Sequence, residues 1–142
     1  MCTVLLLADP VYYLLDMVRG RYEYPELRDT AIALAKRYNP FAILIEDAWT
    51  GTALAQELKR AGLYPVHLIP VQHDKIGRMY VQTGKFERGF VHFPKDAPFM
   101  PELEKELLTF PQSKTDDIVD SISQALAFDQ WGYDLTLSWV DD

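Results

Sequence analysis

The stretch Phe41-Ala42-Ile43-Leu44-Ile45-Glu46-Asp47 (FAILIED, residues 41–47) decides the fold class. Its five consecutive apolar residues are typical of a strand that is buried on both faces of a sheet, as in α/β proteins. The run ends in two acidic residues, Glu46 and Asp47. A carboxylate at the end of a buried strand is held at the sheet edge, where it can serve as a hard oxygen ligand for a divalent cation. The alternative is a solvated strand end that caps the next helix.

The segments on either side of this strand alternate between strand and helix patterns. Upstream, the pattern predicts a β-hairpin over 3–18 that turns at Asp9-Pro10 and then a helix over 25–38. Downstream, it predicts a helix over 52–61, a strand over 66–71, a helix over 74–86, a short strand over 89–93 and helices from 101 and over 116–128. This order predicts a layered α/β domain.

Composition limits the class of protein. With 142 residues, 49% of them hydrophobic and 25% charged, the chain fits one soluble globular domain, residues 1–142. A single cysteine, Cys2, excludes an intrachain disulfide and a four-cysteine zinc site. No apolar run reaches the ~20 residues of a membrane-spanning helix, and the first residues do not resemble a secretory signal. We therefore expect a cytoplasmic protein that does not contact a membrane.

The charge of −7 is unevenly distributed. Residues 1–95 hold 12 Lys or Arg against 10 Asp or Glu, a net of +2, whereas residues 96–142 hold 2 against 11, a net of −9. The basic side chains Lys75, Arg78, Lys85 and Arg88 form a local basic segment. It is either a solvated helix face or a surface that contacts nucleic-acid phosphates. The segment lacks the glycine spacing and the Ser or Thr of a Walker motif, so a nucleotide-binding loop is not indicated.

A second acidic group occurs in Lys114-Thr115-Asp116-Asp117-Ile118-Val119-Asp120. Helix capping and the helix dipole explain Asp116 and Asp117. They explain Asp120 less well, because it lies one turn later on the same helix face as Asp116, and like charges at this spacing are destabilising. A cation between these carboxylates, Mg²⁺ or Mn²⁺, is the favoured interpretation at this point.

Taken in order, these motifs indicate a family. The strand end IED, then GTALAQELK, then the HDK segment and FP-x-x-K-x-DD-x-x-D-S-x-SQAL resemble the C-terminal nuclease domain of the large terminase subunit of tailed bacteriophages. The hairpin segment YYLLDMVRGR and the helix YPELRDTAIALAKRYNP also resemble that domain, so the similarity runs from about Thr3 to Phe128.

The resemblance implies a ribonuclease H-like mixed sheet flanked by helices and an endonuclease that uses two Mg²⁺ or Mn²⁺ ions to cut concatemeric DNA during genome packaging. Glu46, Asp116 and Asp117 would be the catalytic metal ligands. Asp47, Asp120 and Lys114 would orient them, and the basic segment would lie along double-stranded DNA. The portal and the small terminase subunit would be partners, in the cytoplasm of a bacterial host.

The sequence also departs from the family. There the first catalytic aspartate lies on a central strand that precedes the hairpin, and the chain as given opens at the hairpin, with no ATPase half. We therefore expect an N-terminally truncated domain that lacks this strand and cuts DNA weakly or not at all. The gap would be closed by direct pairing of the hairpin with the strand over 41–45, or by a homo-oligomer through exposed strand edges, which we favour.

Two alternatives remain open. One is a non-catalytic prophage remnant or packaging interaction module with the same fold. The other is a different ribonuclease H-like nuclease, such as a resolvase or transposase core.

Overall fold

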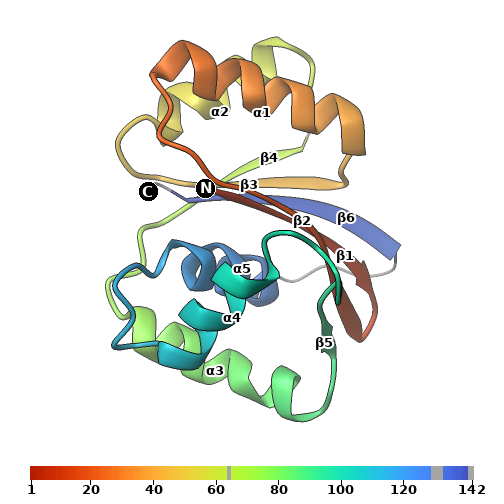
Figure 1. Cartoon of the computed structure of the whole chain (residues 1–142). Coiled ribbons are helices and arrows are strands. Elements are labelled where there is room, and N and C mark those ends of the chain that lie inside the picture. The colour runs from red at the N-terminus through yellow and green to blue at the C-terminus, as the bar shows by residue number, and fades with distance from the viewer. Residues whose placement is uncertain (64, 129–132, 141–142) are drawn as a thin grey trace.

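The computed structural model describes residues 1–63, 65–128 and 133–140, and for Tyr133 and Asp134 only the backbone. It is an α/β domain whose six-stranded mixed sheet has the order β4-β3-β6-β1-β2-β5. Figure 1 shows that α1 and α2 cover one face of this sheet and that α3, α4 and α5 lie on the other side. The predicted layered α/β architecture is confirmed.

The first half of the chain follows the sequence pattern closely. Its elements are β1 (Cys2–Ala8), β2 (Val11–Val18), α1 (Tyr24–Tyr38), β3 (Ala42–Glu46), α2 (Gly51–Arg60) and β4 (Val66–Ile69). The predicted hairpin is confirmed, since β1 and β2 pair antiparallel from Cys2↔Val18 to Ala8↔Val11. Strand β3 is buried on both faces: Ile43 packs in the core under α1 and α2, whereas Leu44 packs in the core on the side of α5.

The second half adds one strand that the sequence pattern did not indicate. Its elements are α3 (Lys75–Glu87), β5 (Val91–His92), α4 (Met100–Thr109), α5 (Asp117–Ala127) and β6 (Tyr133–Trp139). The four segments up to α5 were predicted to within a few residues. Strand β6 was not predicted.

Strand β6 occupies the centre of the sheet. It pairs antiparallel with β1 along the whole length of both strands, from Cys2↔Trp139 to Ala8↔Tyr133, and parallel with β3. The central gap that we expected between the hairpin and β3 is therefore filled by the same chain, and the hairpin does not pair directly with β3. The strand edges through which we expected a homo-oligomer are therefore paired with β6, and the argument for association at this gap is removed.

The two faces of β6 explain why it fits there. Leu137 is fully buried in the core beneath α1 and α2. On the opposite face, Ser138 Oγ donates to the Ser121 carbonyl (2.7 Å), Ser121 Oγ donates to the Ser138 carbonyl (2.6 Å), and Gln124 Nε2 donates to Ser138 Oγ (3.0 Å). Ser121 Oγ also shares a 2.8 Å hydrogen bond with Thr3 Oγ1 of β1. These four residues, Thr3, Ser121, Gln124 and Ser138, form a buried polar seam that joins α5 to β6 and β1.

Among the described residues, none of the helices has both the length and the apolar character needed to span a membrane.

Candidate functional site

Three strand ends meet at one edge of the sheet. Because β3 and β6 are parallel and β1 is antiparallel to β6, the ends of β3 and β6 lie beside the start of β1. The register places Trp139 between Ile45 and Cys2, and the backbone N–H of Val140 donates to the Met1 carbonyl (3.1 Å). Glu46 is the last residue of β3 and therefore lies at this edge.

The turn after β3 is tightly built. The Ala48 N–H donates to the Glu46 carbonyl and the Gly51 N–H donates to the Ala48 carbonyl, both at 2.8 Å. A β-carbon at position 51 would lie 2.1 Å from the Glu46 carbonyl oxygen, so only glycine fits there. Asp47 accepts a 2.8 Å hydrogen bond from the Thr52 hydroxyl, which ties the turn to the first residues of α2. The described contact of Asp47 is thus structural, and its expected role beside Glu46 stays a prediction.

A cleft of about 1150 Å³ opens at the same edge. Its walls come from the start of β1, the segment after β2, the turn before α2, and the start of α5. The lining residues are Met1, Arg19, Gly20, Arg21, Tyr22, Leu27, Trp49, Thr50, Glu102, Lys114, Thr115, Asp116 and Asp117. Two of the three predicted catalytic acids, Asp116 and Asp117, therefore line the cleft, whereas Glu46 does not.

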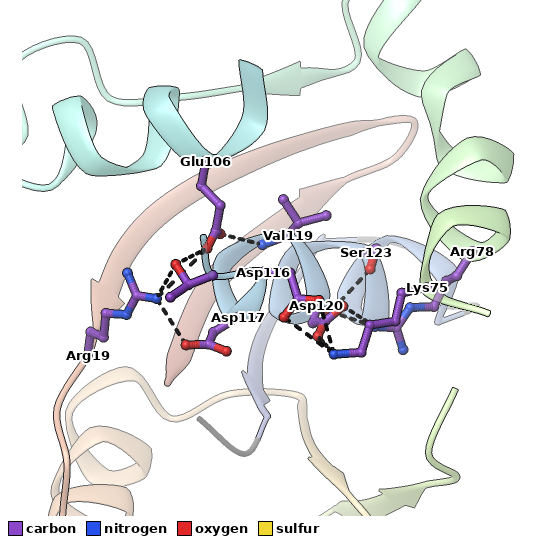
Figure 2. A network of polar contacts seen from close by, with 10 residues as sticks. Arg19, Lys75, Arg78, Glu106, Asp116, Asp117, Val119, Asp120 and Ser123 are labelled. Carbon is purple, nitrogen blue, oxygen red and sulfur yellow. Dashed lines mark hydrogen bonds and ion pairs between the residues drawn. The ribbon is translucent and has the colours of Figure 1, made fainter. Parts of the chain in front are cut away.

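Arg19 holds Asp117 in place, as Figure 2 shows. Arg19 Nη2 donates to Asp117 Oδ2 (2.9 Å) and to Thr115 Oγ1 (3.1 Å), and its other terminal nitrogen pairs with Glu102. Burial alone would lower the pKa of Arg19, but the hydrogen bonds that Arg19 donates to Asp117 and Glu102, and the charges of these carboxylates, outweigh it and raise that pKa. Arg19 was not singled out by sequence reasoning, because nothing in the sequence pairs it with a residue 98 positions away.

A buried carboxylate, Glu106, lies behind Arg19. It is 4% exposed and accepts hydrogen bonds from the Val119 N–H (3.0 Å) and the Thr115 hydroxyl (2.9 Å), which fixes the first turn of α5. Burial raises the pKa of Glu106, and these hydrogen bonds and Arg19 oppose that rise. The sequence did contain a signal for its burial, because Glu106 follows Leu103 at helical spacing on the apolar side of α4.

Between Asp116 and Asp120, where we predicted Mg²⁺ or Mn²⁺, the described residues place the side chain of Lys75, and a metal ion at these carboxylates stays a prediction. Lys75 Nζ lies 2.7 Å from Asp120 Oδ2 and 3.2 Å from Asp116 Oδ2 (Figure 2). Arg78 Nη2 lies 3.2 Å from Asp120 Oδ1. Burial raises the pKa of Asp120, while Lys75 and Arg78 oppose that rise. Helix α3 is thereby fastened to the start of α5, and Asp120 serves this contact.

The predicted DNA-binding residues have different environments. Lys75 and Arg78 are engaged with the α5 carboxylates, and Lys85 donates to the Leu126 carbonyl and lies 5.1 Å from the ring centre of Tyr12. Arg88 is exposed at the end of α3. A role for these four residues in DNA binding stays a prediction, and three of them already have intramolecular partners.

The fit to divalent metal ions is partial. Carboxylate oxygens are the donors that Mg²⁺ and Mn²⁺ prefer. Asp117 offers Oδ1, which makes no hydrogen bond or ion pair with the described residues, beside the Oδ2 that Arg19 holds. However, within residues 1–63, 65–128 and 133–140 no three His, Cys, Asp or Glu side chains lie close enough together to hold a metal ion. The predicted convergence of Glu46, Asp116 and Asp117 into one metal site stays a prediction.

Comparison with known proteins places the chain in a family. No curated protein and no solved structure matches it. The family model described as "Terminase RNaseH-like domain" matches residues 1–128, which is most of the chain and ends just before β6. The sheet order and the flanking helices agree with a ribonuclease H-like fold. The chain therefore belongs to the terminase RNaseH-like domain family.

Proposed function

We propose that the chain is the metal-dependent endonuclease domain of a phage or prophage terminase large subunit, which cuts concatemeric DNA during genome packaging in the cytoplasm of a bacterial host. The family match supports the terminase assignment. The observation that carries the nuclease assignment is the position of Asp116 and Asp117: they begin α5 in the cleft at the sheet edge where β3 ends in Glu46. Double-stranded DNA is the proposed substrate, and the portal and small terminase subunit are the proposed partners.

In this proposal, Glu46, Asp116 and Asp117 would hold Mg²⁺ or Mn²⁺. Bound divalent ions supply positive charge that stabilises the phosphate during in-line displacement and lower the pKa of an attacking water. The role of the protein is to present carboxylates rigidly, and the Arg19 and Glu106 contacts do this for the first turn of α5. The ion pairs of Arg19 and Lys75 oppose metal binding, because they neutralise the carboxylates that the ions need. We therefore expect the isolated chain to cut DNA slowly.

The test is the cleavage of supercoiled plasmid in about 1–10 mM Mn²⁺, a concentration chosen to occupy a weak site for a divalent cation. The wild-type chain should nick or linearise the plasmid slowly. Asp117→Asn and Glu46→Gln should each lower the rate by about 10²-fold or more, on the scale of losing one electrostatic group of an active site. Glu104→Gln, an exposed acid on α4, is the matched control and should cut like wild type.

One observation favours a second function, a non-catalytic packaging module with the same fold. All three acids of the first part of α5 are neutralised internally, Asp117 by Arg19, Asp116 by Lys75, and Asp120 by Lys75 and Arg78. A wild-type chain that binds DNA but leaves the plasmid uncut at every Mn²⁺ concentration, and whose melting temperature does not respond to Mn²⁺, would support this second function instead.

A further inference from the structure

The cleft carries an aromatic side chain whose exposure has no structural explanation. Trp49 is 90% exposed, although tryptophan is usually mostly buried. It lines the cleft together with Asp116 and Asp117. Of the two other tryptophans, Trp139 is buried and Trp131 lies outside the described residues. Trp49 is thus an isolated apolar side chain placed in water at the proposed site.

The backbone of Trp49 is also unfavourable for its residue type. Its φ is 50°, in the left-handed region that bulky residues rarely adopt. The hydrogen bond from Gly51 to the Ala48 carbonyl closes the turn around it, so the conformation is imposed by the turn between β3 and α2. A small residue such as asparagine or glycine would satisfy this turn with less strain. Strained positions of this kind concentrate at functional sites.

Two cations share the cleft with Trp49. Arg21 and Lys114 are both exposed, and neither makes a hydrogen bond or an ion pair with the described residues. They differ in this from Arg19, whose charge is matched by Asp117 and Glu102. A flat aromatic surface that shares a cleft with two cations lacking a partner in the described part of the chain is suited to a ligand that carries both rings and negative charges.

We propose that Trp49 stacks on an unpaired base of single-stranded or frayed DNA in this cleft, while Arg21 and Lys114 contact the flanking phosphates. This inference rests on the proposed function, because it takes DNA as the ligand of the cleft. Intact duplex does not offer the face of a base to an indole ring, whereas a frayed end or a melted site does. Trp49 is accordingly a binding residue that favours opened DNA next to Asp117.

The experiment is fluorescence anisotropy with a labelled oligothymidine and a matched hairpin duplex, in EDTA so that no strand is cut. Replacing Trp49 with alanine should weaken binding of the single strand about 5- to 100-fold, the scale of one base–aromatic stack. Trp49→Phe should retain most of the affinity. The control is Tyr80→Ala, which removes another strongly exposed aromatic side chain, 76% exposed, on α3 outside the cleft lining. It should bind like wild type.

A second variant separates binding from folding. Trp49→Asn suits the left-handed backbone better, so its melting temperature should equal or exceed that of wild type while its affinity for the single strand falls as in Trp49→Ala. An Arg21→Gln, Lys114→Gln double variant should reduce the slope of log affinity against log salt by about 1.4, or ~0.7 for each lost phosphate contact.

The outcomes distinguish this inference from the function on which it rests. If wild type binds the single strand and Trp49→Ala binds it equally well, stacking by Trp49 is refuted and the proposed function stands. If wild type binds the hairpin duplex but not the single strand, the inference is likewise refuted. If wild type binds neither DNA, both proposals fail.

Discussion

The two halves of helix α5 face the same sheet with opposite chemistry. The first turn carries the charged residues Asp116, Asp117 and Asp120, which lie at the cleft or against α3 and are matched by arginine and lysine (Figure 2). The middle carries Ser121 and Gln124, which are neutral, buried and hydrogen-bonded to β6. A carboxylate is costly to bury without a counter-charge, whereas a hydroxyl or an amide needs only a hydrogen bond.

This contrast separates two kinds of contact in the domain: the contacts that fix α5 to the central strand, and the ion pairs around the start of α5. The polar seam and the apolar core fix α5 to the central strand through neutral contacts that do not depend on pH or salt. The charged turn is held by ion pairs that a metal ion, a proton or DNA could exchange. The following predictions test this contrast, beginning with the largest expected effect.

The fold should be strongly destabilised when a charged side chain is placed in the central strand β6. Leu137 is 0% exposed in the middle of β6, so Leu137→Asp should destabilise the fold by about 4 kcal/mol or more through the burial of an unpaired carboxylate and the loss of core packing. Urea unfolding followed by circular dichroism measures the loss. Leu108→Asp, at an 84% exposed position on α4, is the control and should change stability by less than about 0.5 kcal/mol. Equal effects at the two positions would contradict the central placement of β6.

The polar seam should contribute less to the free energy of unfolding than the core packing of Leu137. Ser121→Ala removes the hydroxyl that serves both the Ser138 carbonyl and Thr3, and should cost about 1–3 kcal/mol because buried partners lose their hydrogen bonds. The same urea assay applies, and the loss should be independent of salt. A loss that shrinks at high salt would show that the seam is not the neutral contact described above.

The ion pairs around the start of α5 should contribute less to folding stability and should have a larger effect on metal binding. Arg19→Met removes the partner of Asp117, Glu102 and Thr115, and should cost roughly 1 kcal/mol, since Arg19 is partly solvent-exposed. Because Asp117 then lacks its counter-charge, the increase in melting temperature caused by Mn²⁺ should be larger than in wild type. Thermal unfolding with and without Mn²⁺ measures both effects. An unchanged response to Mn²⁺ would argue against competition between Arg19 and the metal.

The smallest expected effect is a dependence of stability on pH through Glu106. Burial raises the pKa of this carboxyl in the folded state, so the folded protein binds the proton more tightly than the unfolded chain. Its stabilising contribution is full below the unfolded value of about 4.3 and is lost as the pH rises through the raised folded pKa. Glu106→Gln should remove this slope, as measured by unfolding from pH 4 to 7. A steeper decline of stability with rising pH in the variant would contradict a raised pKa of Glu106 in the folded state.

Much of the fold could be predicted from the sequence alone. Strand β3 was predicted because a continuous apolar run is a local signal of burial on two faces, and the hairpin and α5 followed from similar local patterns. The acidic motif also predicted Asp116 and Asp117 at the start of a helix, and the structure places both in the lining of the cleft, whereas their role as metal ligands stays a prediction. Strand β6 was missed, although Leu135 and Leu137 alternate with Thr136 and Ser138, because its hydroxyl side chains resemble those of a solvent-exposed edge.

By itself, the sequence determined the helices and every strand except β6, the family, and the acidic residues at the start of α5, because each depends on short-range periodicity or on motifs that are contiguous in the chain. Only the tertiary structure decided that β6 fills the centre of the sheet and that Lys75, 41 residues before Asp116, is the cation beside that carboxylate. Both depend on contacts between distant segments. Strand pairing is set by backbone hydrogen bonds and ion pairing by distance in space, and neither leaves a local signature in the sequence.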